Sequence, residues 1–247
     1  MEASVIRYSL DLLVRLVDTT TGGSVDSRDA LFFENGQQIK PMPKGGGNYI
    51  FLNEKREDRT LTIRVYGYEE CELLIRYDEL DSALPTKEAF LIPAGEARTG
   101  ESILRLTGTL KGITAIEAVC ISQTGWCISE FDERKRIMKL FRSQNRFSTE
   151  NIYYGLINTV NDTYESFEIL KQVSEDSVKI KKPLEEEFSV NSPISRIVFG
   201  RTYPDGRYVL AVRDNATDLR YLVKYRIGDV DHFQAVDFHQ SLDNLLK

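Results

Sequence analysis

Leu12 to Thr21 reads LLVRLVDTTT and is followed by Gly22. The apolar part of this run predicts a strand, and the Asp, Thr and Gly residues that follow it favour a turn. Two more runs follow, Asn48 to Leu52 (NYIFL) and Leu61 to Tyr68 (LTIRVYGY). In NYIFL, Tyr49 and Phe51 share one strand face, because side chains alternate along a strand. This order of strands and turns predicts a small antiparallel β-sandwich, a module more typical of assembly or binding than of catalysis.

Apolar and polar residues alternate with a period of two along most of the chain, which indicates strands with one wet face. Asn35-Gly36 and Pro204-Asp205-Gly206 lie between such runs and supply the positive φ angles that tight hairpins need. The pattern predicts strands near residues 5–17, 30–34, 48–53, 59–66, 69–76, 88–92, 102–109, 113–121, 126–131, 151–158, 164–171, 194–200, 206–213, 219–227 and 232–238.

The predicted fold class is therefore all-β, with two antiparallel β-sandwich or barrel domains in tandem and one or two short helices. We expect the first domain at residues 1–93, a breaker-rich linker at 94–100 and the second domain at 101–247. Asp132 to Phe141 (DERKRIMKLF) suggests a helix with Ile137, Leu140 and Phe141 on one side. A short terminal helix is expected over Ser241 to Leu246, with Ser241 as its cap.

The runs quoted first resemble the transthyretin/carboxypeptidase-regulatory-like β-sandwich family, at Leu12 to Gly23, Asn48 to Leu52 and Leu61 to Glu69. The resemblance covers the first third of the chain only. It implies an accessory module without catalytic residues, of a kind that occurs on surface proteins, on enzymes and in phage tails and tail-like contractile particles. Gly67 is expected to let the backbone turn where a side chain would clash.

Charge and composition exclude several classes of function. The 247 residues carry a net charge of −6, and the first 93 hold 11 Lys/Arg against 16 Asp/Glu. A mildly acidic chain is a poor candidate for nucleic acid or anionic membranes. Three cysteines, Cys71, Cys120 and Cys127, without a CxxC pair, suit a reducing compartment. Neither a signal peptide nor a membrane-spanning run is recognisable, so we expect a cytoplasmic protein, or one assembled into a particle from the cytoplasm.

The largest local concentration of positive charge is the most interesting surface feature. We propose its residues as contacts for a protein partner: Arg134, Lys135, Arg136, Lys139 and Arg142. The simpler interpretation is a solvated face or loop with no partner. Guanidinium and ammonium groups suit an acidic protein surface.

Other reactive residues give no clear constellation. His232 and His239 are seven apart, which puts them on opposite faces of a strand. Cys120 and Cys127, expected on adjacent strands, are typical of buried thiols. The carboxylate runs 185–187 and 69–70 are typical of solvated loops. Trp126 is either core packing or a stacking platform for a ligand. We therefore predict no catalytic residue, no metal site and no cofactor.

Three functions remain open at this point. The favoured one is a non-enzymatic structural protein, such as a component of a phage tail or contractile tail-like particle. It would dock neighbouring subunits in a homo- or hetero-oligomer through sheet edges and loops. The alternative is a small-molecule or glycan-binding accessory module. The third, an enzyme of unrecognised type, would need a pocket that brings His232 or Cys127 beside a carboxylate.

Overall fold

The structure is a computed structural model that describes residues 9–27, 29–52, 55–94, 103–122, 124, 126–142, 153–185, 188–213, 220–238 and 246. Within these residues it has 19 strands and a single 3-10 turn, which confirms the all-β prediction. The chain forms two compact units, residues 1–18 with 24–94, and residues 19–23 with 95–247. Among the residues described, no helix is long and apolar enough to cross a membrane.

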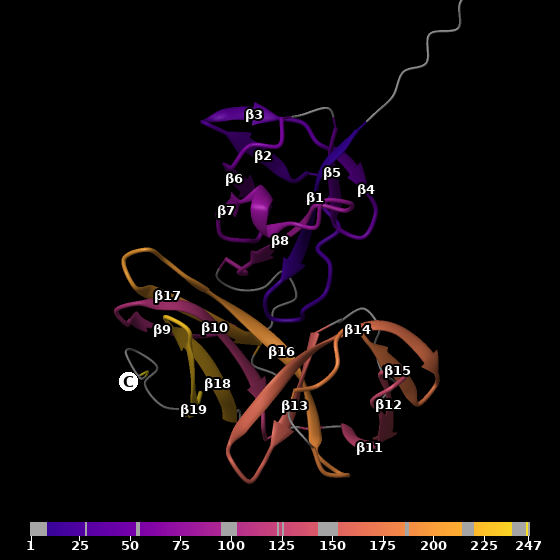
Figure 1. Cartoon of the computed structure of the whole chain (residues 1–247). Coiled ribbons are helices and arrows are strands. Elements are labelled where there is room, and N and C mark those ends of the chain that lie inside the picture. Colours follow the sequence, from indigo (N-terminus) through magenta and orange to yellow (C-terminus); the bar gives the residue numbers. More distant parts are fainter. Residues whose placement is uncertain are drawn as a thin grey trace, which may run out of the picture. The chain divides into compact units, whose positions relative to one another are not determined.

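The first unit stacks two four-stranded sheets, ordered β4-β5-β1-β8 and β3-β2-β6-β7 (Figure 1). Its elements are β1 (Leu10–Asp18), β2 (Leu31–Glu34), β3 (Gln37–Ile39), β4 (Met42–Lys44), β5 (Asn48–Leu52), β6 (Arg59–Arg64), β7 (Cys71–Ile75), the 3-10 turn η1 (Tyr77–Glu79) and β8 (Thr86–Leu91).

Inward-facing residues of both sheets form one core. Phe32 of β2 is fully buried and packs against Tyr49 and Phe51 of β5, with ring centroids 4.7 and 5.8 Å away. Tyr49 and Phe51 thus share one strand face and one core, as predicted. Two turn predictions are also confirmed: Asn35 and Gly36 both have positive φ between β2 and β3, and Gly67 has a φ of 83° after β6.

One pairing in this unit departs from the antiparallel expectation. β1 pairs antiparallel with β5, but it pairs parallel with β8, from Leu13 beside Thr86 to Asp18 beside Leu91. A parallel partner needs a long connection, and here most of the unit intervenes between the two strands. Alternation along a strand is the same in both directions, so the sequence pattern does not distinguish them.

The second unit is built around β16, a ten-residue strand that belongs to both of its halves (Figure 1). Its other strands are β9 (Ile103–Thr109), β10 (Ile113–Cys120), β11 (Trp126–Asp132), β12 (Ile137–Arg142), β13 (Tyr153–Asn158), β14 (Thr163–Ser174), β15 (Ser177–Ile180), β17 (Arg207–Arg213), β18 (Arg220–Ile227) and β19 (Val230–Asp237); β16 itself spans Pro193–Thr202.

The first half is a closed ring of six strands, because β16 pairs with both β11 and β13. The ring runs β16-β11-β12-β15-β14-β13 and returns to β16. Alternate residues of each strand point inward and make a single core, including Ile128, Met138, Leu156, Phe167 and Ile180. The ring therefore has no free sheet edge of its own.

The second half is an open sheet, ordered β9-β17-β16-β10-β18-β19. One face carries a core that includes Ile116, Tyr208 and Val223. The opposite face packs through Val119, Leu222 and their neighbours against Ile157 and Tyr164 of the ring strands. Close approach here depends on Gly155 of β13, where an added β-carbon would meet Val119 Cγ1 at 2.6 Å.

The predicted helix over Asp132 to Phe141 is wrong. This segment is the end of β11, a turn over residues 133–136, and β12. The Asp132 carboxylate accepts a hydrogen bond from the Lys135 backbone N–H, and Arg136 has a φ of 55°, a conformation that ends a helix. Met138 and Leu140 then point into the ring while Phe141 is 64% exposed, the alternation of a strand.

Other differences concern short elements. The sequence pattern did not reveal β3, β4 and β15, which have only three or four residues each. The terminal helix proposed over Ser241 to Leu246 lies outside the described residues, apart from Leu246 itself, which is buried against the open sheet's core. Residues 95–100 of the proposed linker are likewise outside the described part of the chain.

Candidate functional site

The basic residues predicted as partner contacts lie on the hairpin of β11 and β12, and only some of them face solvent without a partner. Lys135 pairs with Asp132, with 3.2 Å between Nζ and Oδ2. The Arg136 guanidinium donates a hydrogen bond to the backbone oxygen of Lys181. Arg134 and Lys139 are exposed. The backbone of Arg142 pairs with Trp126, but its side chain is outside what the structure describes.

The structure adds two lysines to this set. Lys179 of β15 lies between the inward-pointing Val178 and Ile180, so its own side chain is on the outer face of the ring. In the antiparallel register Lys179 is directly opposite Ile137 of β12 on one side and Lys171 of β14 on the other. Two like charges opposite one another in a sheet destabilise it. Neither lysine makes an ion pair with any residue that the structure describes.

We define the basic face as Lys139, Lys171 and Lys179, on the outer side of β12, β14 and β15, together with the exposed Arg134 in the turn between β11 and β12. It is not free of acids: Glu130 is opposite Lys139 in the register, and Lys139 is one of the groups that lower the pKa of Asp176. Its excess positive charge is therefore concentrated at Lys171 and Lys179. The alternation of Val178, Lys179 and Ile180 in the sequence could have identified Lys179, but nothing in the sequence pairs it with Lys171.

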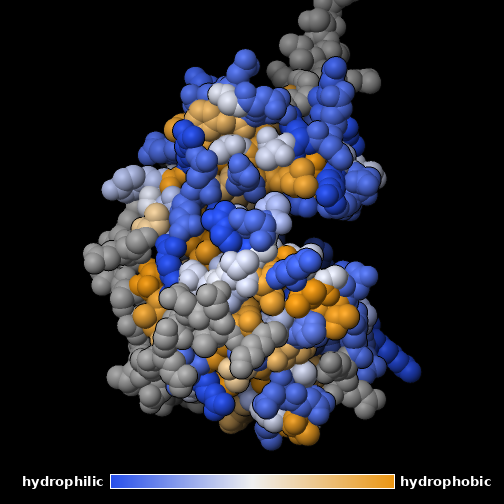
Figure 2. Space-filling model, turned by 90° about the vertical axis from the view of Figure 1, so that its left-hand side faces the viewer, coloured by the Kyte–Doolittle hydropathy of each residue, from blue (hydrophilic) through white to orange (hydrophobic). Residues whose placement is uncertain are grey.

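Exposed apolar side chains lie on the same strands. Phe141 of β12 is 64% exposed, and Leu170 and Val173 of β14 are 54% and 49% exposed. Of these groups, the aromatic ring of Phe141 and the guanidinium of Arg134 are of the types that are enriched in protein interfaces. On the face of the molecule that Figure 2 shows, the hydrophobic residues form several patches that hydrophilic residues separate.

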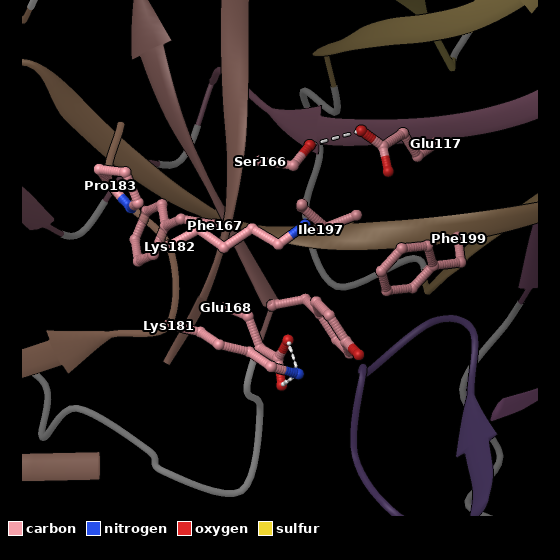
Figure 3. Close-up of a pocket in the computed structure, with 10 residues that line it drawn as sticks. Glu117, Ser166, Phe167, Glu168, Lys181, Lys182, Pro183, Ile197 and Phe199 are labelled. Atoms are coloured by element: carbon pink, nitrogen blue, oxygen red, sulfur yellow. Dashed lines mark hydrogen bonds and ion pairs between the residues drawn. The ribbon is translucent and has the colours of Figure 1, made fainter. Parts of the chain in front are cut away.

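A groove of about 270 Å³ lies elsewhere on the second unit, between the ring and the open sheet (Figure 3). β10, β13, β14 and β16 contribute to it, together with the segment after β15. Its lining residues are Glu117, Tyr153, Ser166, Phe167, Glu168, Lys181, Lys182, Pro183, Ile197 and Phe199.

Glu117 of β10 is held at one end of this groove by several groups. It accepts a hydrogen bond from the Ser166 hydroxyl at 2.6 Å, and Lys224 Nζ lies 3.7 Å from the same carboxylate. Tyr164 of β14 is buried, and its burial raises the pKa of its hydroxyl well above the ordinary value. The Glu117 charge raises that pKa further. Lys224 also pairs with Asp231 at 3.3 Å. The carboxylate is therefore fixed by its neighbours before any ligand arrives.

The remaining walls of the groove are aromatic and charged. Tyr153 and Phe199 form an edge-to-face pair with ring centroids 5.3 Å apart. Both oxygens of Glu168 accept hydrogen bonds from Lys181 Nζ, at 2.8 and 3.1 Å. Lys182, which is exposed, also lines the groove, and its side chain extends across it in the view of Figure 3.

The other candidate residues do not converge on reactive chemistry. Cys71, Cys120 and Cys127 form no disulfide. Cys120 and Cys127 lie on β10 and β11, which both pair with β16 rather than with each other. His232 stacks on Tyr225 with centroids 5.2 Å apart, and His239 lies outside the described residues. Among the residues described, no group of three or more His, Cys, Asp or Glu side chains has the geometry of a metal site.

Neither Trp126 nor the described part of the acidic runs lines the groove. The Trp126 ring is partly buried and packs on Tyr154 of the ring core, with centroids 5.7 Å apart, and it does not line the groove. Glu69 and Glu70 lie in the connection between β6 and β7, where Glu70 pairs with Arg64. Glu185 is exposed, whereas 186 and 187 are outside the described part of the chain.

Comparison with known proteins found no match: no family model, no curated protein and no solved structure corresponds to this chain. The resemblance to the transthyretin/carboxypeptidase-regulatory-like family therefore stays a prediction.

Proposed function

We propose that this chain is a non-enzymatic structural protein, and that an acidic surface of another protein subunit docks on the basic face. The observation that carries the proposal is the pair Lys171 and Lys179, which lie opposite one another in adjacent strands and form no ion pair with the acidic residues that the structure describes. A sheet that keeps two like charges in this position has a less stable free state than one with a neutral or opposite pair. A carboxylate from a partner, placed between the two ammonium groups, removes that repulsion.

The neighbouring side chains support a protein partner rather than a free anion. Phe141, Leu170 and Val173 present apolar area that a flat protein surface can cover, at about 25 cal/mol per Å² removed from water. Charged groups then contribute mainly to partner choice and to the rate of association. A nucleic acid is a weaker candidate, because the chain as a whole has a net charge of −6.

Sheet edges offer a second way to dock a neighbour. In the part of the chain that the structure describes, β19 pairs only with β18, and β9 pairs only with β17. Both are seven or eight residues long, enough to accept an added strand by main-chain hydrogen bonds. We also propose that the chain is a subunit of a phage tail or of a contractile tail-like particle that assembles in the cytoplasm.

The test is isolation of the full-length tagged chain from its native cells, with and without Lys171→Glu and Lys179→Glu together. We expect a stoichiometric protein partner, or further copies of this chain, to co-purify with the wild type and to be lost with the double variant. Lys111→Glu, an exposed charge reversal in the turn before β10, is the matched control and should retain the partner. Electron microscopy of the purified complex then shows whether it is a particle.

Two results would contradict the proposal. One is a wild-type chain that elutes as a lone monomer from a fresh extract. The other is co-purification of nucleic acid instead of protein, removed by nuclease and by the double variant alike.

A further inference from the structure

We propose that the groove of Figure 3 binds one ring of a neutral saccharide, a role separate from the docking of a subunit on the basic face. The inference depends on three properties of the lining residues: an aromatic wall, a fixed set of hydrogen-bonding groups, and balanced charge. None of them involves Trp126, the residue that sequence patterns single out for ligand stacking.

The aromatic wall is formed by Tyr153 and Phe199. Their edge-to-face arrangement keeps the two rings at nearly a right angle, 88°, so they meet as a corner rather than as a closed stack. Ile197 also lines the groove but is fully buried, so the two partly buried aromatic rings provide the apolar surface that a ligand can touch. A corner of two aromatic rings excludes water from the C–H faces of a small ring that sits against it.

The polar groups surround this apolar corner. The carboxylate of Glu117 and the hydroxyl of Ser166 lie at one end, and Glu168 with Lys181 at another. The Lys182 ammonium reaches into the middle (Figure 3). Paired carboxylates keep lone pairs for further hydrogen bonds, and the ammonium has three donors. Hydroxyl groups both donate and accept, so a polyhydroxylated ring can use all of these groups at once.

Charge balance decides which class of polar ligand fits. The groove is lined by two carboxylates, Glu117 and Glu168, and by two ammonium groups, Lys181 and Lys182. Lys224, behind Glu117, adds a further cation, but its charge is shared with Asp231. For a cation the attraction of the carboxylates is offset by the repulsion of the lysines, and for an anion the reverse holds, so neither gains from the lining as a whole. A neutral ligand leaves the existing ion pairs intact.

Size and rigidity agree with a single ring. A cavity of about 270 Å³ is just below the range of about 300–1,000 Å³ found for drug-sized ligands. Because Glu117 and Glu168 are already held by Ser166 and Lys181, little side-chain freedom is lost on binding. The walls come from strands rather than from loops, apart from the segment 181–183.

The experiment uses the full chain on an array of immobilised oligosaccharides built from neutral hexoses and N-acetylhexosamines. The strongest sugar is then measured as its free methyl glycoside by calorimetry and by saturation-transfer NMR. We expect Phe199→Ala to reduce affinity by about two- to tenfold, the scale of one lost aromatic contact. Lys182→Ala, at an exposed position, should reduce affinity several-fold without affecting the fold. Lys111→Ala is the matched control and should bind as the wild type does.

Phe199 contributes to packing, so a second variant protects the test against loss of folding. Phe199→Tyr keeps the ring and should keep binding, and Trp126 fluorescence reports whether each variant is folded. Affinity for a neutral sugar should also be nearly independent of salt, because no net charge is neutralised. Failure of subunit docking would not affect these results, since the basic face lies on other residues.

Three outcomes would overturn the inference: no neutral sugar on the array binds; binding survives Phe199→Ala in a folded protein; or the groove variants abolish binding of a charged ligand, such as an acidic peptide or a nucleotide, whose affinity falls steeply with salt.

Discussion

Lys171 of β14 and Lys179 of β15 lie directly opposite one another in an antiparallel pair. Since their repulsion is present in the free protein, its removal should raise stability. We expect Lys179→Glu to raise the free energy of unfolding by about 0.2–1 kcal/mol. Urea unfolding at low salt measures the change, and high salt should reduce it. Lys111→Glu should have no such effect. A destabilised Lys179→Glu variant would mean that the two lysines do not repel each other.

Gly155 is required by the close approach of the open sheet to the ring. A β-carbon there would lie 2.6 Å from Val119 Cγ1 and 2.9 Å from the Tyr164 ring. We expect Gly155→Ala to destabilise the second unit by about 1–3 kcal/mol, the usual cost of overpacking. Unfolding followed by Trp126 fluorescence measures it. Gly45→Ala is the control, because no atom in the described part of the chain lies within 4 Å of an added β-carbon there. Equal stability of both variants would show that the two faces can separate without cost.

The hairpin of β11 and β12 makes a prediction that a helix would not make. Met138 is fully buried in the ring, whereas Phe141 is 64% exposed. We expect Met138→Ala to cost about 2–5 kcal/mol. Phe141→Ser should change stability by no more than about 0.5 kcal/mol. Thermal and urea unfolding of the two variants provide the comparison. The reverse order of effects would support the helix over 132–141 instead.

The ion pairs on the open sheet give the protein a specific acid sensitivity. Arg226 donates two hydrogen bonds to Asp231, at 2.6 and 3.1 Å. The Arg226 hydrogen bond lowers the pKa of Asp231 below its ordinary 3.8, and Lys224 lowers it further although burial opposes both. Because the folded-state pKa is the lower one, ionised Asp231 favours the folded state above pH 3.8, and this contribution is lost as the pH falls below that value.

Asp231→Asn should therefore lose stability at neutral pH and show a weaker fall in stability between neutral pH and about pH 3. Urea unfolding across this range measures both effects. Parallel profiles for Asp231→Asn and the wild type would exclude this residue as a source of acid sensitivity.

The sequence predicted most strands because alternation and turn chemistry are local. Tyr49 and Phe51 share a face in any strand, and Asn35-Gly36 adopts positive φ wherever a tight hairpin forms. The same local reasoning failed over Asp132 to Phe141, where Ile137, Leu140 and Phe141 fit a helical spacing by chance. The inward positions Met138 and Leu140 fit a strand equally well, and pairing with β15 decided between the two.

The candidate sites were only partly predictable for the same reason. Arg134 and Lys139 could be named because they are close together in the sequence. Lys171 and Lys179 become neighbours through the register of β14 and β15. Tyr153 and Phe199 become neighbours because β13 pairs with β16. The pairing of strands that are distant in the chain depends on the free energy of the whole packed unit, which no short window of residues contains.

By itself the sequence determined that this protein is made of strands, where most of them lie and, in β5, that Tyr49 and Phe51 share one face. It could do so because a two-residue period and left-handed turn residues act within a few positions of the chain. Only the tertiary structure decided that β1 and β8 run parallel, that β16 closes a ring of six strands, and that a groove and a basic face form on it. Each of these depends on hydrogen bonds and packing between residues that are brought together only when the whole unit folds.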